Sequence, residues 1–335
     1  MSITAKKLAQ ILGLSETAVS MALHGKNGVS TETRQRVIKE AEKHGYDFSK
    51  IKSNETESKT IYAVQCIASN ACMSYTPIFS ELNEGIQSVA SREHINVKQL
   101  QIWEKADDLD RYLEDLRVSD CLGIILLATE SSIDVFQKFT ALNIPIVILD
   151  TYFENLGCDS VLINNEAGSY LATDYLISRT KVQPGYIGSS FRIPNFEERL
   201  VGYKKAIREN GLSVSRSIMH EVSPTFDGAF SDMLNLIEDN TPLAKSYFCD
   251  NDIIAIGVIK ALKLKGYKVP EDIAVIGFDN ISESRIIEPS LTTMDVPRHY
   301  MGECAARQLI FRAKNNVQSP VKIAVAPTLI KRFSV

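Results

Sequence analysis

The sequence predicts a small all-α domain followed by an α/β core of two doubly wound subdomains, each with a parallel sheet. Three observations lead to this fold class. Residues 3–46 hold three short helical patterns, and residues 61–150 alternate strand-length apolar runs with amphipathic helices. The same alternation resumes after about residue 160. Alternating strands and helices form βαβ units, and 335 residues give room for two or three domains.

The first domain should be a compact three-helix unit. Hydroxyl residues that can act as N-caps precede each apolar pattern, and Gly45 suits the position just past the last helix. We predict helices over about 5–11, 15–23 and 31–44, with N-caps at Thr4, Ser15 and Thr31. A polar ridge from Ser15 to Ser20 should face outward. Such a unit is too small for an enzyme cleft but has a shape that fits the DNA major groove.

Charge is divided unevenly along the chain. Residues 1–52 hold nine Lys and Arg against five acidic residues, a net +4, while the remainder carries −8. A basic head on an acidic body fits a phosphate-binding module attached to a body that avoids DNA. The modest charge suggests that two heads are needed for tight binding.

The body should alternate strands with helices twice. The predicted elements of its first half are strands 61–68, 97–102, 121–128 and 145–150, and helices 77–95, 107–118 and 134–144. Those of its second half are strands 160–164, 185–189, 217–222, 246–250 and 272–278, and helices 166–179, 195–211, 227–239 and 252–266. Two such halves imply a cleft between them, with ligands at the strand carboxyl ends.

The chain should divide into three parts. A head spans residues 1–46, a polar linker 47–59, and a ligand-binding and dimerisation domain 60–335. Within the last, we expect an N-subdomain of about 60–161 and 293–325. The C-subdomain should then comprise about 162–292 and 326–335.

Several function classes find no support in the sequence. The five histidines are dispersed, and no nucleophile elbow, P-loop or zinc-protease motif occurs, so we expect no enzyme and no cofactor. The six cysteines lack metal-ligand spacing and should be small core residues in a reducing compartment. No apolar run approaches the length of a membrane span, and the N-terminus lacks an apolar signal core. We therefore expect a cytoplasmic protein with no membrane partner.

Specific motifs run through nearly the whole chain. The body carries Arg199-x-x-Gly202-Tyr203, Asn251-Asp252-x-x-Ala255-x-Gly257, Val269-Pro270-x-Asp272-Ile273-x-Val275-x-Gly277-Phe278-Asp279-Asn280 and Pro289-x-Leu291-Thr292-Thr293. The head carries Thr4, Ala9, Gly13, Leu14, Ser15, Val19, Ser20, Leu23, Gly28, Val29, Ser30, Thr33 and Arg34. This combination resembles the LacI/GalR-type transcriptional regulators, with a helix-turn-helix head and a core like the type I periplasmic sugar-binding proteins.

The resemblance and the residue chemistry together suggest how the head would contact DNA. Residues expected at phosphates are Thr4, Ser15, Ser20, Ser30, Thr33 and Arg34. Base reading is expected from Glu16, Thr17 and Met21, with His24 at the edge. Family members often have Arg where Met21 stands, and Met cannot form the bidentate pair with guanine, so we expect an unusual half-site. The alternative is that Met21 belongs partly to the core of the head.

The linker departs from the family pattern. Relatives usually continue with Pro-Asn and then Ala-Arg-x-Leu, a hinge helix whose leucine wedges into the minor groove. Here Tyr46 is followed by Asp47-Phe48-Ser49-Lys50-Ile51, so Ile51 is the only candidate wedge. Without a wedge, coupling of the body to the head would be weaker or would act through the spacing of the heads.

The resemblance also implies effector contacts in the cleft. Arg199 supplies a planar fork, Asn251 a donor and an acceptor, Asp279 an acceptor, and Phe79 an aromatic face. Arg199 and Asp279 could instead pair with each other as a structural salt bridge. Loop residues Asp150, Arg192 and Asn195 are further candidates, whereas stacking by Phe226 is in doubt.

These observations predict a dimeric DNA-binding repressor controlled by a small molecule. The expected partners are a near-palindromic double-stranded operator, a second copy of the chain and an effector, for which a carbohydrate is the family's commonest answer. The dimer face should include helix 77–93. Two alternatives remain open: a transport-type sugar-binding protein without a DNA role, and a regulator answering to a protein co-repressor. The sequence identifies neither the effector nor whether it releases or strengthens DNA binding.

Overall fold

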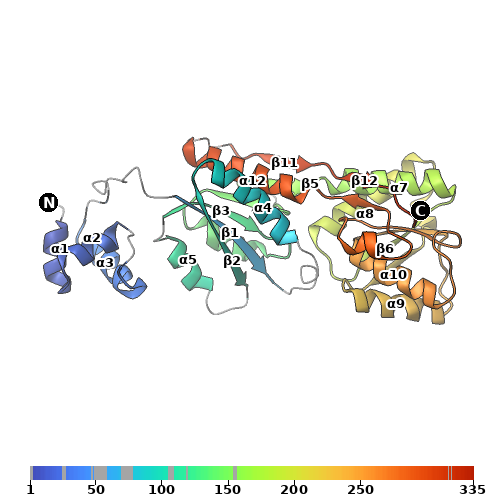
Figure 1. The fold of residues 1–335 in the computed structure, drawn as a ribbon, viewed down its shortest axis with the longest axis horizontal. Helices are drawn as coiled ribbons and strands as arrows, with labels where there is room; N and C mark the ends of the chain where they lie inside the picture. The colour runs from blue at the N-terminus through green and yellow to red at the C-terminus, as the bar shows by residue number, and fades with distance from the viewer. Residues whose placement is uncertain are drawn as a thin grey trace.

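The computed structural model describes residues 3–24, 28–46, 48, 59–68, 78–104, 109–117, 120–153, 157–315, 317 and 319–335. The helical head comes first along the chain, and the two α/β subdomains follow it (Figure 1). Each subdomain has its own parallel sheet. The predicted fold class is confirmed.

The head consists of α1 (Ala5–Leu12), α2 (Glu16–Leu23) and α3 (Thr31–Lys43). Thr4 and Ser15 cap the first two helices as predicted, accepting from the backbone N–H groups three residues on. The predicted cap Thr31 is wrong: Ser30 caps α3 and accepts from the Thr33 N–H at 3.2 Å, while Thr31 already lies in the helix. The helices share a small core made of Leu8, Ala9, Val19, Ala22, Leu23, Val37 and Ala41.

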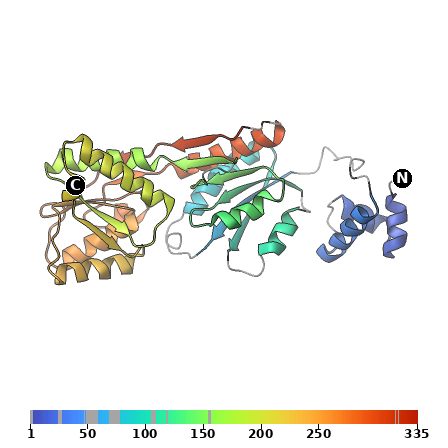
Figure 2. The same cartoon turned by 180° about the vertical axis from the view of Figure 1, so that it is seen from behind.

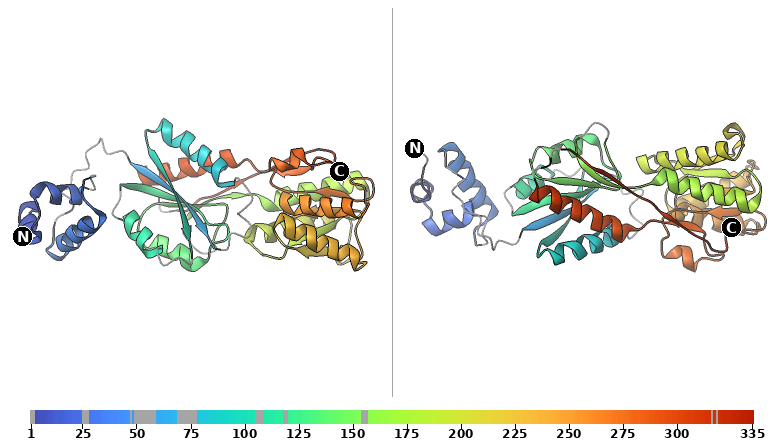
Figure 3. Two further views of the ribbon diagram at one scale, coloured as in Figure 1. Left: turned by 60° about the horizontal axis from the view of Figure 1, so that its bottom comes forward. Right: turned by 90° about the horizontal axis from the view of Figure 1, so that it is seen from above.

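The N-subdomain is built on a six-stranded parallel sheet of order β11-β5-β4-β3-β1-β2. Its strands are β1 (Thr60–Ile67), β2 (Asn96–Trp103), β3 (Cys121–Leu127), β4 (Ile146–Leu149), β5 (Asp159–Ile163) and β11 (Lys322–Val325). Its helices are α4 (Ile78–Arg92), α5 (Leu109–Arg117), α6 (Ile133–Thr140) and α12 (Arg298–Lys314). Helices α4 and α12 cover one face, while α5 and α6 cover the other (Figure 3). Because both faces are covered, β1 is buried along its whole length.

The C-subdomain has a four-stranded parallel sheet of order β7-β6-β8-β9. Its strands are β6 (Gly185–Ser189), β7 (Met219–Val222), β8 (Ser246–Cys249) and β9 (Ala274–Ile276). Its helices are α7 (Asn165–Thr180), α8 (Pro194–Glu209), α9 (Phe226–Glu238), α10 (Asp252–Leu264) and the short α11 (Glu283–Ile286), with a 3₁₀ turn at Val214–Arg216. Helices α7 and α8 pack on one face, and α9 and α10 on the other (Figure 2).

The chain passes between the two subdomains three times. The first passage joins β5 to α7, and the others run through β10 (Thr293–Asp295) and β12 (Thr328–Ile330). Strands β10 and β12 pair antiparallel and lie alongside α7 (Figure 3). These crossings hold the two sheets so that their strand carboxyl ends face a common space. Among the described residues, no helix is long and apolar enough to cross a membrane.

Candidate functional site

A cavity lies where the two subdomains meet. The N-subdomain contributes Leu82, Thr129, Asp150, Ile163, Val296, Arg298 and Met301. The C-subdomain contributes Ile193, Asn195, Phe196, Arg199, Asn251 and Asp279. Five of the seven sequence-predicted effector residues therefore share one cavity.

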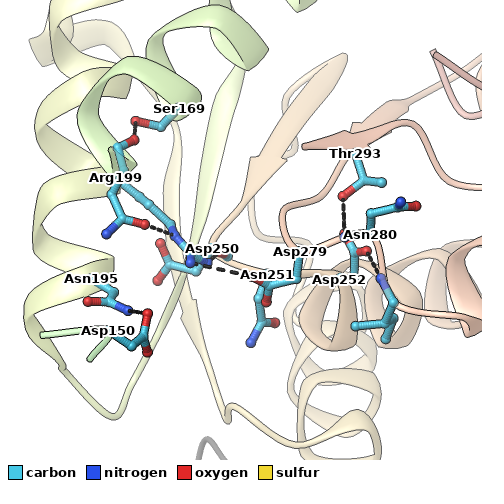
Figure 4. A network of polar contacts seen from close by, with 12 residues as sticks. Asp150, Ser169, Asn195, Arg199, Asp250, Asn251, Asp252, Asp279, Asn280 and Thr293 are labelled. Atoms are coloured by element: carbon cyan, nitrogen blue, oxygen red, sulfur yellow. Dashed lines mark hydrogen bonds and ion pairs between the residues drawn. The ribbon is translucent and has the colours of Figure 1, made fainter. Parts of the chain in front are cut away.

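Arg199 lies at the centre of the polar wall (Figure 4). It is 3% exposed, and its guanidinium lies 3.8 Å from the centroid of the Phe278 ring. Its nitrogens donate to Asn165 Oδ1 at 2.9 Å, to the carbonyl oxygen of Asp250 at 2.5 Å and to Asp279 Oδ1 at 3.4 Å. The salt bridge between Arg199 and Asp279 that we left as an alternative is thus formed. A ligand that uses either group must share it or displace its partner.

Asp150 directly follows β4 and occupies the left-handed region with φ +68°. Thr129, which follows β3 in the same way, donates to Asp150 Oδ2 at 2.6 Å. Asn195 donates to Asp150 Oδ1 at 3.1 Å from α8 of the other subdomain (Figure 4). Burial raises the pKa of Asp150 to about 6, although these donors act in the opposite direction. The group is therefore an anionic acceptor at neutral pH.

Asn251 is the N-cap of α10, and its Oδ1 accepts from the Ile254 N–H at 2.9 Å. The cap uses the oxygen, so the amide nitrogen is the part of this side chain that can serve a ligand. The residue thus combines a structural role with a donor role, which the sequence alone did not separate.

A layer of buried acids supports the cavity from behind. Asp250 accepts from the Tyr186 hydroxyl and, at 2.7 Å, from the Ser189 N–H; burial raises its pKa to about 6. Asp252 accepts at 2.5 Å from each of the hydroxyls of Ser284 and Thr293, and burial raises its pKa to about 7. These bonds fix the loops that carry Arg192 and Asp279.

Two predicted residues do not line the cavity. Phe79 lies in the first turn of α4 and packs, partly buried, against the core between α4 and α12. Arg192 donates to Glu197 Oε1 at 2.7 Å, and this pair lies at the protein surface. Phe226, which we doubted, packs on the α9–α10 core with the Lys260 ammonium 4.7 Å from its ring centroid.

Sequence reasoning missed Thr129, Phe196 and Arg298, which line the cavity. For Thr129 a signal existed, since it follows β3 as Asp150 follows β4. Arg298 gave none, because an arginine at a helix start is normally expected at the surface, yet this one is only 5% exposed. Its burial depends on the crossing of β10 into α12.

The predicted DNA-contacting residues cluster at α2 and at the helix starts of the head. Glu16, Thr17 and Ser20 are exposed, whereas Met21 and His24 are half-buried. His24 Nδ1 lies 2.8 Å from the Ser20 carbonyl oxygen, and Lys6 Nζ lies 3.9 Å from Glu16 Oε1. The cap hydroxyl oxygens of Thr4, Ser15 and Ser30 accept backbone bonds, which leaves O–H groups to donate.

The remaining head residues lie on α3 and beyond it. Thr33 Oγ1 lies 2.8 Å from Ser30 Oγ, and Arg34 is half-buried. The predicted linker of residues 47–59 falls, apart from Phe48 and Lys59, outside the described residues, and so does the candidate wedge Ile51. Its role stays a prediction.

A helical head joined to two sheets around a polar cavity is the architecture of ligand-controlled DNA-binding regulators. Residues 173–335 match the family described as the periplasmic binding protein-like domain. The chain is 30% identical to the HTH-type transcriptional repressor PurR of Mannheimia succiniciproducens, over 99% of this chain and 98% of that protein. It is 27% identical to the ribose operon repressor of Haemophilus influenzae, with the same coverage. Its fold matches that of the transcriptional regulator CelR in complex with cellobiose, with a TM-score of 0.74, 22% identity, and coverage of 99% of this chain and 100% of that one.

The chain therefore belongs to the LacI family of transcriptional regulators. The resemblance drawn from the sequence motifs is confirmed.

Proposed function

We propose that this protein is a cytoplasmic, dimeric repressor that binds a near-palindromic operator and is controlled by a carbohydrate effector in the cavity between its subdomains. The single observation that carries the proposal is the cavity itself. Arg199, Asn195 and Asn251 bring donors into it, while Asp150 and Asp279 bring acceptors, all of them buried. Vicinal hydroxyls need this mixture of donors and acceptors.

The cavity walls come from both subdomains, so a ligand that bridges them favours one relative arrangement. Asp150 and Asn195 already join the two halves through a hydrogen bond, and so do Arg298 and Asp279 through their charges. A ligand shifts such an equilibrium only by its differential affinity for the two arrangements. The change would reach DNA through the spacing of the paired heads.

The operator should be read by the exposed edge of α2. Glu16 can accept from a cytosine amino group, and Met21 can contact a thymine methyl group. Arg34, together with the hydroxyls of Ser15 and Ser30, would hold phosphates and set the register without reading sequence.

The test selects operators from random double-stranded DNA with the full chain and then measures gel shifts at 50 and 200 mM salt. We expect a two-fold symmetric sequence whose affinity falls by about 10³-fold or more over this salt range. Arg34→Gln should weaken binding to all sequences equally and lower the salt slope by about 1. Failure of the full chain to bind DNA at low salt would refute the repressor role.

A further inference from the structure

Arg298 is the cavity residue that a binding site for a neutral sugar does not explain. This residue opens α12, lines the cavity, and is 5% exposed. Its Nη1 donates to Glu81 Oε2 at 3.3 Å. Its Nη2 is fully buried and has no hydrogen-bond acceptor among the described residues; Asp279 Oδ1 lies 3.6 Å away. A buried guanidinium nitrogen without an acceptor is costly unless something else completes its contacts.

Two guanidiniums share one carboxylate oxygen in the corner of the cavity that holds Arg298. Arg199 and Arg298 approach the same oxygen, Asp279 Oδ1, at 3.4 and 3.6 Å. One carboxylate therefore faces two guanidiniums in a corner where all three groups are buried. The other partner of Arg298, Glu81, is 42% exposed on its side chain, so solvent screens its contribution.

The N-terminal ends of two long helices add positive electrostatic potential to the cavity. Residues at the N-terminal ends of α8 and α12 line the cavity, and neither helix has a side-chain cap that bonds its first N–H groups. Helix N-termini favour negative charge nearby. Asp150, held by Thr129 and Asn195, is left to accept from hydroxyl groups instead.

We propose that the effector is an acidic monosaccharide, whose carboxylate or phosphate binds Arg298 and Arg199 beside Asp279 while its hydroxyls bind Asp150, Asn195 and Asn251. This inference rests on the proposed function, because it names the ligand class of that cavity. The anionic group supplies the missing acceptor of Arg298 Nη2. A planar carboxylate can engage an arginine fork through two parallel hydrogen bonds.

The test uses the full chain and matched pairs of probes. Glucuronate and glucose 6-phosphate are compared with glucose, galacturonate with galactose, and ribose 5-phosphate with ribose. Thermal shift finds the binders, and calorimetry measures their affinities. The variants are Arg298→Gln, which removes the charge, and Arg298→Lys, which keeps it. Arg307→Gln is the control, since Arg307 is an exposed arginine on the same helix that pairs with Glu303.

We expect at least one acidic sugar to bind at least tenfold more tightly than its neutral counterpart. Arg298→Gln should erase this preference, Arg298→Lys should keep part of it, and Arg307→Gln should leave it unchanged. Sugar acids and sugar phosphates are separate arms, so the binder identifies which anion the site takes. If no acidic sugar stabilises the wild-type protein more than Arg298→Gln, or if in every pair the neutral sugar binds as tightly as its acidic counterpart, the inference is overturned.

A gel shift on the selected operator, made with the same samples, separates the two proposals. An acidic sugar that binds through Arg298 without changing operator affinity supports the inference and counts against effector control. A neutral sugar that changes operator affinity equally in wild type and Arg298→Gln supports effector control and counts against the inference.

Discussion

Arg199 is a charged side chain that the protein can bury because each part of its guanidinium has a partner. Three oxygens accept from it, and the Phe278 ring covers its face. Removing one member of such a set leaves the others buried and uncompensated.

We therefore expect Arg199→Met to lower the free energy of unfolding by about 3 kcal/mol and to abolish effector binding. Arg179→Met, at an exposed arginine on α7, should change stability by less than about 0.5 kcal/mol. Urea unfolding curves measure both effects. Equal stability of Arg199→Met and wild type would show that the buried contacts contribute nothing net.

Asp150 should make effector affinity depend on pH. The carboxylate accepts ligand hydroxyls only when ionised, and its pKa is about 6 in the free protein. Affinity should thus fall about tenfold between pH 7 and pH 5, and Asp150→Asn should bind weakly without this slope. Calorimetry across this pH range provides the measurement.

The stability of the free protein should depend on pH in the opposite direction to effector affinity. The pKa of Asp150 is higher in the folded state than its ordinary value of 3.8, so protonation favours the folded state. The contribution of this group to stability therefore grows as the pH falls from about 7 towards 4. A rise of affinity at pH 5 would contradict the role of Asp150 as an acceptor.

Among the elements, α4 and α12 approach each other most closely at two glycines. A Cβ atom at Gly85 would lie 1.9 Å from the carbonyl oxygen of His299, and one at Gly302 would lie 2.0 Å from that of Leu82. Both contacts involve backbone atoms, which cannot move without separating the helices. This pairing sets the position of Arg298, which directly precedes His299 at the start of α12.

Gly85→Ala and Gly302→Ala should each lower the free energy of unfolding by about 2–3 kcal/mol through this clash. Gly157→Ala is the matched control, because a Cβ there meets nothing within 4 Å. Thermal or urea unfolding measures the difference. If Gly85→Ala were as stable as wild type, the two helices would have room for an additional methyl group at this contact.

The strands and the longer helices as far as β9 could be predicted from the sequence, because apolar runs and helical periods recur there. The elements that follow residue 278 were not predicted, namely α11, β10, α12, β11 and β12. The strand 185–189 was predicted with its observed ends, and most helix ends differ by one to three residues. Side chains that a single strand end positions, such as Asp150 and Asp279, could also be predicted. Arg298 could not, since its partners are Glu81, which lies 217 residues earlier in the chain, and Asp279, which belongs to the other subdomain. The ion pair between Arg192 and Glu197 also could not be predicted, because no sequence pattern indicates it.

At the scale of the whole molecule, the cavity and the head should be separable by mutation. Asp279→Asn keeps the shape of the residue but removes the charge between Arg199 and Arg298. We expect operator affinity without effector to stay within about twofold of wild type, while the effector loses its influence on DNA binding. Titrating the effector in a gel shift measures this coupling, with wild type as the reference. An unchanged response would place the effector elsewhere.

The three passages between the subdomains have a consequence for how the polypeptide is made. The sheet that begins with β1 is completed only by α12 and β11, which leave the ribosome after the whole stretch from α7 to β10. At ordinary translation speeds this delay is roughly ten seconds. Until then, the apolar side of α4 and the outer edge of β5 have no cover. The C-subdomain, whose segments are largely contiguous in the sequence, should therefore fold first. The nascent N-subdomain should be the part of this protein that chaperones bind.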